Sequence, residues 1–327
     1  MSIDILYSLP LSTECNFGRI WLKEIDMLST KYVIKQIPPT GDELVQDHIT
    51  SNSDFIENTR SLHSWSRFSL LSIREANIRN IPSVLESMSM HVLDQKNILK
   101  NYFKLNKYMV KKMIKEYHEC KYMVVPSSLV KHSMIKRGID ESKIHIVPYG
   151  VDVDKFDFKR IEHDGFRILY VGPFTYRKNV ISLVKAFREM NTNKKCELFL
   201  VGDGCNKLTD IANNIYGMSY MSDDLLIKKY QSSDLLVYPS IIEGFGLTVL
   251  ESLSCGTPVI VSNMTGIRDI VHDRIGFVVE PKTNVLREFI KYALEYDFSA
   301  RECRKVAEKN KWDINMKKLL NLYDSII

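Results

Sequence analysis

Short apolar runs alternate with longer amphipathic stretches along the whole chain. This alternation is typical of the βα units that build a parallel sheet, so the predicted fold class is α/β. In the first half, the pattern predicts a helix over 16–28 and strands at 4–10, 31–37, 82–87, 122–127 and 143–149. In the second half, runs rich in β-branched and aromatic residues predict strands at 167–172, 196–204, 234–240, 258–262 and 276–280.

The polar segment 152–165 separates the two halves and is predicted to be a linker. A chain of 327 residues is long for one doubly wound domain and suits two domains of about 150 residues each. We expect Rossmann-like domains over 1–155 and 156–310, with a helix over about 311–327 that packs back on the first domain. The two domains are expected to face each other across a cleft, with ligands at the carboxyl ends of the strands.

The composition is that of a globular protein, with 45% hydrophobic and 26% charged residues. The sequence contains no run of about 18 apolar residues, and its first residues lack the basic and apolar segments of a secretory signal. The six cysteines form no C-x-x-C pair, which favours reduced, buried thiols over a disulfide framework or a zinc site. We therefore expect a cytoplasmic protein.

Basic residues are concentrated in one region, because residues 91–150 carry twelve basic and five acidic side chains. Within this region, residues 94–121 contain eight lysines against three acids, and their apolar residues recur at helical spacing. The simpler interpretation is a surface helix whose apolar stripe lies in the core. The sharper hypothesis is that the lysines dock the protein peripherally on an anionic surface at the inner face of a membrane. No nucleic-acid recognition motif accompanies the lysines, so no nucleic-acid partner is expected.

The loop 171–179 joins a predicted strand to a helical stretch and contains Gly172, Arg177 and Lys178. Two cations at the start of a helix are locally unfavourable, because the helix dipole is positive there. A phosphate or diphosphate would compensate this charge. The alternative is a solvated basic turn.

A second loop, at 243–248, places an acid before a glycine-rich elbow and leads into a predicted helix. Gly244 and Gly246 allow the backbone to approach a ligand closely. The N–H groups from Phe245 through Leu247 to Thr248 would then form a cradle for an anion or a hydroxyl group. Glu243 in the loop and Glu251 in the helix are acceptors suited to vicinal hydroxyls of a sugar or ribose. Helix capping and solvation are the alternative interpretation.

Together these motifs resemble the retaining GT-B glycosyltransferases of the large GT4 family. In that family an E-x7-E element, usually E-G-F-G-x-x-x-x-E, follows a Pro-Ser strand end, and one branch carries R-K-N in the earlier loop. The same order is present here, and the resemblance covers roughly residues 120–327. Further matching stretches are 147–156, 202–204, 255–262 and the region of Trp312. Two departures are Pro173, where many members have Arg, and Thr248, where the family usually has Pro.

The resemblance implies roles for individual residues in binding a nucleoside-diphosphate sugar. Arg177 and Lys178 would hold the diphosphate, assisted by Thr248 and the Gly246–Leu247 amides. Glu251 would bind the ribose, Glu243 the transferred sugar, and residues around Tyr216 to Tyr220 would line the base.

The first domain is expected to bind the acceptor. There the resemblance singles out His91, which aligns with a histidine beside the donor sugar, so that His91 and Glu243 are the catalytic candidates. His91 would either form a hydrogen bond to the sugar or help to transfer a proton. Asn16 and Gly18 lie in the only candidate for the family's N-terminal acceptor-side loop.

The resemblance thus implies a retaining, metal-independent hexosyltransferase that acts on a glycan, lipid-linked or other hydroxyl acceptor. No cofactor or metal is expected, because the nucleotide sugar is a co-substrate. The R-K-N loop favours a GDP-mannose-like donor. Alternatives are a sugar-nucleotide epimerase, a non-catalytic nucleotide-sugar-binding module, and an oxidoreductase that uses residues 201–204 as its glycine turn. The oxidoreductase alternative is disfavoured, because the sequence lacks the full G-x-G-x-x-G fingerprint that it would need.

Overall fold

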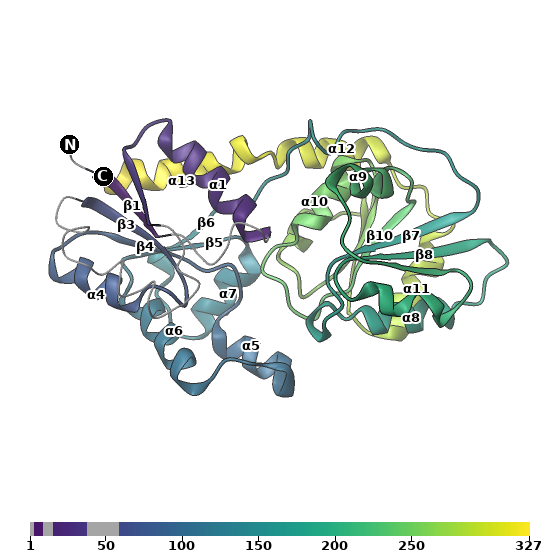
Figure 1. Ribbon diagram of the computed structural model, residues 1–327, viewed down its shortest axis with the longest axis horizontal. Coiled ribbons are helices and arrows are strands. Elements are labelled where there is room, and N and C mark those ends of the chain that lie inside the picture. Colours follow the sequence, from purple (N-terminus) through teal and green to yellow (C-terminus); the bar gives the residue numbers. More distant parts are fainter. Residues whose placement is uncertain (1–2, 9–15, 38–58) are drawn as a thin grey trace. The chain divides into compact units, whose positions relative to one another are not determined.

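A computed structural model describes residues 3–8, 16–37 and 59–327. It divides the chain into two compact units (Figure 1). The N-terminal unit comprises Met1–Tyr149 and Trp312–Ile327, and the C-terminal unit comprises Gly150–Lys311. The chain therefore passes between the units twice.

The N-terminal unit is built on a parallel six-stranded sheet in the order β2-β1-β3-β4-β5-β6. Its strands are β1 (Ile3–Ser8), β2 (Ile34–Ile37), β3 (Thr59–Trp65), β4 (Ser83–Glu86), β5 (Tyr122–Val125) and β6 (Ile144–Ile146). Its helices are α1 (Asn16–Ser29), α4 (Leu70–Ile78), α5 (Val92–Leu99), α6 (Lys107–Glu119), α7 (Ser128–Lys136) and α13 (Trp312–Ile326). In Figure 1 the yellow α13 lies beside the purple α1, which it contacts directly.

The C-terminal unit has a second parallel six-stranded sheet, in the order β12-β11-β10-β7-β8-β9. Its strands are β7 (Phe166–Val171), β8 (Cys196–Val201), β9 (Ile215–Met218), β10 (Leu235–Tyr238), β11 (Val259–Ser262) and β12 (Gly276–Val279). Its helices are α8 (Val180–Arg188), α9 (Asp223–Gln231), α10 (Leu247–Ser254), α11 (Thr283–Ala293) and α12 (Ala300–Lys309). All residues of β10 and β11 are buried, as expected for strands covered by helices on both faces.

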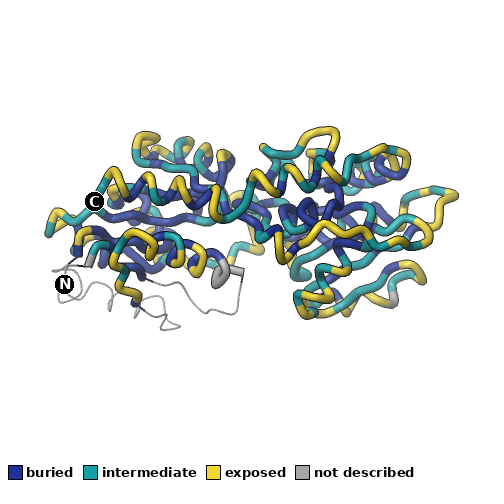
Figure 2. Tube along the Cα trace, turned by 90° about the horizontal axis from the view of Figure 1, so that it is seen from above, coloured by how far each residue is buried: buried dark blue, intermediate teal, exposed yellow. Residues whose placement is uncertain are grey.

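The α/β prediction is confirmed, and every predicted strand is present. Figure 2 shows the buried strands as dark blue segments inside each unit, with exposed positions on the surrounding helices and loops. Two strands were missed. β3 reads Thr-Arg-Ser-Leu-His-Ser-Trp, and its buried Ser61, His63 and Ser64 conceal the apolar signal. β9 is a four-residue strand that contains Gly217.

The predicted linker 152–165 is packed on the C-terminal unit and is no free connector. Phe156 is buried, and the N–H of Ile161 donates to the carbonyl of Gln231 at 3.0 Å. Arg160 donates to the carbonyl of Ser233 at 2.6 Å and to the Thr257 hydroxyl at 2.7 Å. These bonds tie the segment to the ends of α9 and α10.

Two expectations drawn from composition concern the cysteines and membrane spans. The described cysteines are all buried and none forms a disulfide; they are Cys120, Cys196, Cys205, Cys255 and Cys303. Cys15 lies outside the described residues. No helix in the described ranges is long and apolar enough to cross a membrane.

The lysine-rich segment 94–121 is two helices, α5 and α6, and not the one helix that its spacing suggested. A short 3-10 turn (Lys100–Tyr102) follows α5, and the Asn106 side chain caps α6 by accepting from the N–H of Met109 at 2.9 Å. Lys112, one of the eight lysines, is only 4% exposed. The hypothesis of membrane docking by the remaining lysines stays a prediction.

Lys112 and Glu116 on α6 hold the loop that follows β3. Arg67 in this loop has φ of +89°, a conformation that costs a non-glycine residue about 1–2 kcal/mol. The buried Glu116 carboxylate accepts from the N–H groups of Arg67 at 2.7 Å and Ser69 at 2.9 Å. Lys112 Nζ donates to the Arg67 carbonyl at 3.0 Å. Two charged side chains thus fix one strained loop.

Replacing Glu116 with Gln should lower the free energy of unfolding of the N-terminal unit by about 2–3 kcal/mol, because an amide accepts fewer hydrogen bonds and carries no charge. Urea denaturation followed by tryptophan fluorescence would measure this. The three tryptophans (Trp21, Trp65 and Trp312) all belong to that unit.

Glu119→Gln is the matched control on the same helix. Its carboxylate pairs with Arg74 at the surface, where the two side chains are 30% and 44% exposed. Its loss should therefore cost less than about 1 kcal/mol. Equal effects of the two substitutions would contradict the assigned role of Glu116.

Candidate functional site: a charged cluster at the ends of two strands

The loop after β7 is fixed to the end of β10. It forms a 3-10 turn (Tyr176–Lys178) before α8 begins. Asn179 closes the turn in the left-handed conformation, with φ of 56°, and its amide donates to the carbonyls of Pro239 at 3.1 Å and Pro281 at 2.8 Å. The N–H of Ile241 donates to the carbonyl of Arg177 at 2.9 Å. The two loops singled out in the sequence therefore lie side by side.

Glu243 joins these loops through three hydrogen bonds to one carboxylate oxygen. Its Oε2 accepts from Lys178 Nζ at 2.5 Å, from an Arg177 guanidinium nitrogen at 2.6 Å and from the Tyr238 hydroxyl at 3.1 Å. Lys178 also donates to the Tyr238 hydroxyl. Lys178 is 7% exposed, whereas the Arg177 side chain is 40% exposed. We call Arg177, Lys178, Tyr238 and Glu243 the charged cluster.

Burial and charge oppose each other at Glu243. Burial alone would raise the pKa of its carboxyl group, but the charges of Lys178 and Arg177 outweigh it and lower the pKa to about 2. Burial lowers the pKa of Lys178, and Glu243 partly offsets this effect. The cluster thus holds two cations and one carboxylate, which leaves a net positive charge at the carboxyl ends of β7 and β10.

The second loop has the backbone geometry that the elbow predicted. Gly246 has φ of +124°, and a Cβ there would lie 3.2 Å from Ile267 Cγ2. Helix α10 begins at the next residue without a side-chain cap. The amides of Leu247 and Thr248 are in the first turn and have no preceding helical carbonyl to bond. They add the positive end of a helix next to the charged cluster.

Gly172 allows the first loop to fold back over its own strand. Its φ is +152°, and a Cβ there would lie 2.8 Å from the hydroxyl oxygen of Tyr170. That hydroxyl donates to the carbonyl of Pro173 at 3.0 Å. A side chain at position 172 would therefore displace Tyr170 from beneath the loop.

Residues 152–311 match the family model described as glycosyl transferases group 1. The C-terminal unit is a group 1 glycosyltransferase domain. The matched range contains both loops and every residue of the charged cluster. The predicted resemblance is confirmed, and the R-K-N variant stays a prediction.

Curated relatives are glycosyltransferases as well. An uncharacterised glycosyltransferase of Methanocaldococcus jannaschii is 28% identical over 239 residues, which cover 63% of this chain and 60% of its own length. The O-antigen chain mannosyltransferase B of Escherichia coli is 36% identical over 124 residues, 35% of this chain and 32% of its own. The chain thus spans 60% and 32% of these relatives.

Solved structures with the same fold cover nearly the whole chain. Sucrose-phosphate synthase of Thermosynechococcus elongatus has a TM-score of 0.78 at 15% identity, over 99% of both chains. HepE of Anabaena in complex with UDP-glucose has a TM-score of 0.74 at 14% identity, over 98% of this chain and 100% of that chain. The predicted GT-B fold is confirmed.

Three other predicted residues of the glycosyltransferase domain have the following surroundings. Glu251 on α10 accepts from the buried Tyr230 hydroxyl at 2.8 Å. Tyr216 on β9 stacks on Phe199 of β8, with ring centroids 5.0 Å apart. Tyr220 is 81% exposed.

His91 in the N-terminal unit caps α5. Its Nδ1 accepts from the N–H of Leu93 at 3.1 Å, and its backbone N–H donates to the Ser133 hydroxyl at 2.9 Å. The residue is 1% exposed, and burial lowers its pKa to about 4, so the ring is neutral near pH 7. Because Nδ1 accepts, the ring proton is on Nε2. Asn16 and Gly18 lie in the first turn of α1, where side chains are not among those described.

Sequence reasoning missed two residues that organise the site. Tyr238 supplies the hydroxyl that bridges Lys178 and Glu243, and Asn179 ties the first loop to β10. Both residues lie next to motifs of the sequence analysis: Tyr238 precedes the Pro-Ser strand end, and Asn179 is the last residue of the R-K-N loop. Their contacts follow from the pairing of β7 with β10.

The ion pairs of Glu243 should make the stability of the glycosyltransferase domain depend on acid. The pKa of Glu243 is lowered from 4.5 to about 2, which corresponds to about 3 kcal/mol of stabilisation. Because the folded-state pKa is below the unfolded one, this contribution is complete above about pH 4.5 and is lost as the pH falls toward about 2.

Calorimetry of the wild type and Glu243→Gln between about pH 6 and pH 3 would measure this dependence. The unfolding transition of the C-terminal unit is the one to compare. It can be distinguished from that of the N-terminal unit because no tryptophan lies in the C-terminal unit, so tryptophan fluorescence does not report it. The difference in stability should narrow as the pH falls. A constant difference would show that the carboxylate charge does not stabilise the domain.

Proposed function

We propose that the protein is a retaining, metal-independent hexosyltransferase that uses a nucleoside-diphosphate sugar. The charged cluster is the observation that carries the proposal. It places two cations and the first turn of a helix at one point of a glycosyltransferase domain, where a diphosphate would be the matching anion.

The cluster can exchange partners when the donor binds. A diphosphate would take over hydrogen bonds from Lys178 and Arg177 that Glu243 now accepts. The carboxylate would then be available to accept from hydroxyls of the transferred sugar. Charge that develops on the leaving diphosphate would be stabilised by preorganised cations and amides, the role that a divalent ion has in other enzymes.

The state of Glu243 supports a route without a covalent enzyme intermediate. Its oxygen is held by two cations and a phenol, and its pKa is lowered to about 2. After the diphosphate takes the two cations, the carboxylate would still accept from the Tyr238 hydroxyl and from the sugar hydroxyls, which keeps it a weak nucleophile and a weak base. We propose that the sugar–phosphate bond breaks on the face that the acceptor hydroxyl attacks. The acceptor oxygen bonds to the anomeric carbon, and its proton goes to the leaving phosphate.

His91 would act as a hydrogen-bond donor rather than as a base. Its Nδ1 is occupied by the cap of α5, and its low pKa keeps the ring neutral. Only the Nε2–H group would then be presented to a donor sugar. This favours the first of the two roles that the resemblance implied.

The similar proteins support both a mannosyl and a glucosyl donor. The Escherichia coli relative is an O-antigen chain mannosyltransferase, and the HepE structure contains UDP-glucose. Together with the R-K-N loop, the relative leads us to propose a GDP-mannose-like donor and a glycan or lipid-linked hydroxyl acceptor. The epimerase and binding-module alternatives are not favoured, because the relatives are transferases.

Lys178→Ala and Glu243→Ala should each reduce the rate of sugar transfer at least about tenfold, equivalent to about 1.4 kcal/mol. Lys178→Ala removes a phosphate partner, and Glu243→Ala removes the sugar acceptor and leaves Lys178 buried without its anion. Lys185→Ala is the matched control, because Lys185 is exposed on α8 outside the cluster. Wild-type rates in both cluster variants would refute the site.

Stimulation of sugar transfer by added Mg²⁺ or Mn²⁺ would refute metal independence.

A thermal-shift panel of UDP-, GDP-, ADP- and dTDP-sugars would identify the donor. Specific binding stabilises the folded domain by about 2.7 kcal/mol at a ligand concentration 100 times Kd. We expect the largest shift with GDP-mannose, and a smaller shift in Lys178→Ala. A larger shift with another nucleotide would replace the proposed base. No shift with any member would argue against nucleotide-sugar binding.

A further inference from the structure

A second cluster of titratable side chains, which the proposed donor chemistry does not use, is buried in the N-terminal unit. It consists of Glu24 from α1, His63 from β3 and Glu86 from β4, which we call the Glu-His-Glu cluster. The three residues are 0%, 0% and 1% exposed. His63 Nε2 lies 3.4 Å from Glu86 Oε2 and 3.9 Å from Glu24 Oε2. One possible ligand atom from each residue lies within 4.8 Å of the others.

Each member of the cluster is held on one side by a tyrosine. Tyrosine hydroxyls from β1, from the segment after β6 and from α13 surround the three side chains. The pairs are Tyr7 with Glu24 Oε2, Tyr323 with His63 Nδ1 at 2.8 Å, and Tyr149 with Glu86 Oε1 at 2.9 Å. Tyr7 also stacks on the His63 ring, with centroids 4.4 Å apart. The three side chains are therefore fixed in orientation.

The other polar atom of each member has no hydrogen-bond partner. These atoms are Glu24 Oε1, His63 Nε2 and Glu86 Oε2. A buried polar atom without a partner costs about 1–3 kcal/mol, and an unpaired buried charge costs more. Three such atoms at one point, on side chains that are otherwise bonded, indicate a common partner between them.

We propose that the Glu-His-Glu cluster binds a divalent transition-metal ion, most favourably Zn²⁺. Two carboxylates balance the charge of such an ion, and one imidazole nitrogen with two carboxylate oxygens is a donor set that zinc accepts. Ligand atoms bound at about 2.1 Å to one tetrahedral ion lie about 3.4 Å apart. The 3.4 Å between His63 Nε2 and Glu86 Oε2, two of the unbonded atoms, matches that separation. The other Glu24 oxygen, Oε2, which accepts from Tyr7, lies 3.9 Å from His63 Nε2.

The tyrosines are suitable outer partners for a metal site. Metal-bound histidines usually donate their second ring N–H to an oxygen, and metal-bound carboxylates are themselves hydrogen-bonded. Here the Tyr323 oxygen is placed to accept from His63 Nδ1–H, which leaves Nε2 as the metal ligand. Tyr7 and Tyr149 donate to the carboxylates.

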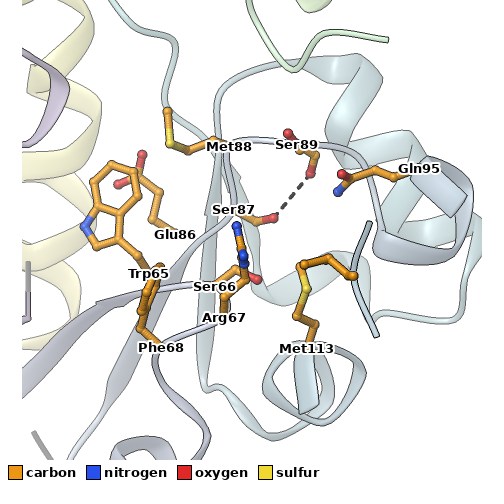
Figure 3. Close-up of a pocket in the computed structure, with 11 residues that line it drawn as sticks. Trp65, Ser66, Arg67, Phe68, Glu86, Ser87, Met88, Ser89, Gln95 and Met113 are labelled. Atoms are coloured by element: carbon orange, nitrogen blue, oxygen red, sulfur yellow. Dashed lines mark hydrogen bonds between the residues drawn. The ribbon is translucent and has the colours of Figure 1, made fainter. Parts of the chain in front are cut away.

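The pocket in Figure 3 adjoins the cluster at Glu86, and an ion would enter from this side. Glu86 and Trp65 end strands β4 and β3 and line this pocket, a cavity of about 210 Å³, together with Arg67 and Gln95. The rest of the cluster is buried behind these strand ends. The ion would thus join α1, β3 and β4 in the N-terminal unit, a structural role separate from the donor's diphosphate.

Metal analysis of the purified full-length protein tests the proposal. The protein should contain about one ion per chain after dialysis, or after refolding with ZnCl₂. His63→Ala and Glu86→Gln should each lower the bound metal at least about tenfold, because removing a ligand or its charge weakens the site. A strong chelator should lower the thermal stability of the wild type, and added Zn²⁺ should restore it.

Glu116→Gln is the control for general damage to the N-terminal unit. It also removes a buried carboxylate charge there, outside the cluster, so it should lose stability and keep its metal. Should the cluster variants fail to fold, X-ray absorption of the wild-type protein loaded with Zn²⁺ gives a second test. It should show nitrogen and oxygen ligands that include one imidazole.

Two results would overturn the proposal. One is a wild-type protein with less than about a tenth of an ion per chain even after refolding with ZnCl₂. If Glu86→Gln were also as stable as the wild type, the result would show that the carboxyl groups of Glu24 and Glu86 share a proton instead. The other is a first shell that contains sulfur or lacks imidazole, which would place the metal elsewhere.

Discussion

In a parallel sheet all strands end at the same edge, and the organisation of the glycosyltransferase domain depends on this constraint. β7 and β10 are neighbours in the sheet although they are far apart in the chain, and the loops that follow them therefore meet.

 The 63 residues from 172 to 234 lie between the end of β7 and the start of β10. Strand pairing brings Arg177 and Lys178 into contact with Glu243 across that interval. Gly172 and Gly246 then allow both loops to fold closely over the strand ends.

The two units stabilise buried charge in different ways. In the charged cluster, two cations share one carboxylate oxygen, and the surplus positive charge remains for a ligand. In the N-terminal unit, Lys112 and Glu116 bond to backbone groups of the loop that contains Arg67, so their charges stabilise the conformation of that loop. The Glu-His-Glu cluster has tyrosine partners on one side and three unbonded atoms on the other. These three unbonded atoms are where the proposed ion would bind.

The charged cluster is therefore preformed, and donor binding would replace interactions rather than create them. A diphosphate would compete with Glu243 for Lys178, whose burial makes an unpaired ammonium costly. This competition would couple recognition of the phosphates to release of the carboxylate toward the sugar. A donor that lacks either part would leave one half of the exchange incomplete, which would give the site selectivity for complete nucleotide sugars.

The apolar pattern of the sequence determined the α/β class, most strands and the helix α1, because buried parallel strands are nearly continuous apolar runs. Motif order also identified the family and the two loops that carry the charged cluster. The strand β3 was not visible, since its inward-facing serines and His63 are satisfied only by partners elsewhere in the fold.

Tertiary structure alone decided which side chains meet. Three features depend on strand order, which local sequence does not encode: the bond from Lys178 to Tyr238, the placement of Asn179 at the end of β10, and the gathering of the Glu-His-Glu cluster. The same holds for Lys112. Its lysine-rich segment was predicted to be a surface helix, but the side chain is buried and donates to the Arg67 carbonyl in the loop after β3. Local propensity specifies elements, whereas contacts between distant residues follow from how the sheets are ordered.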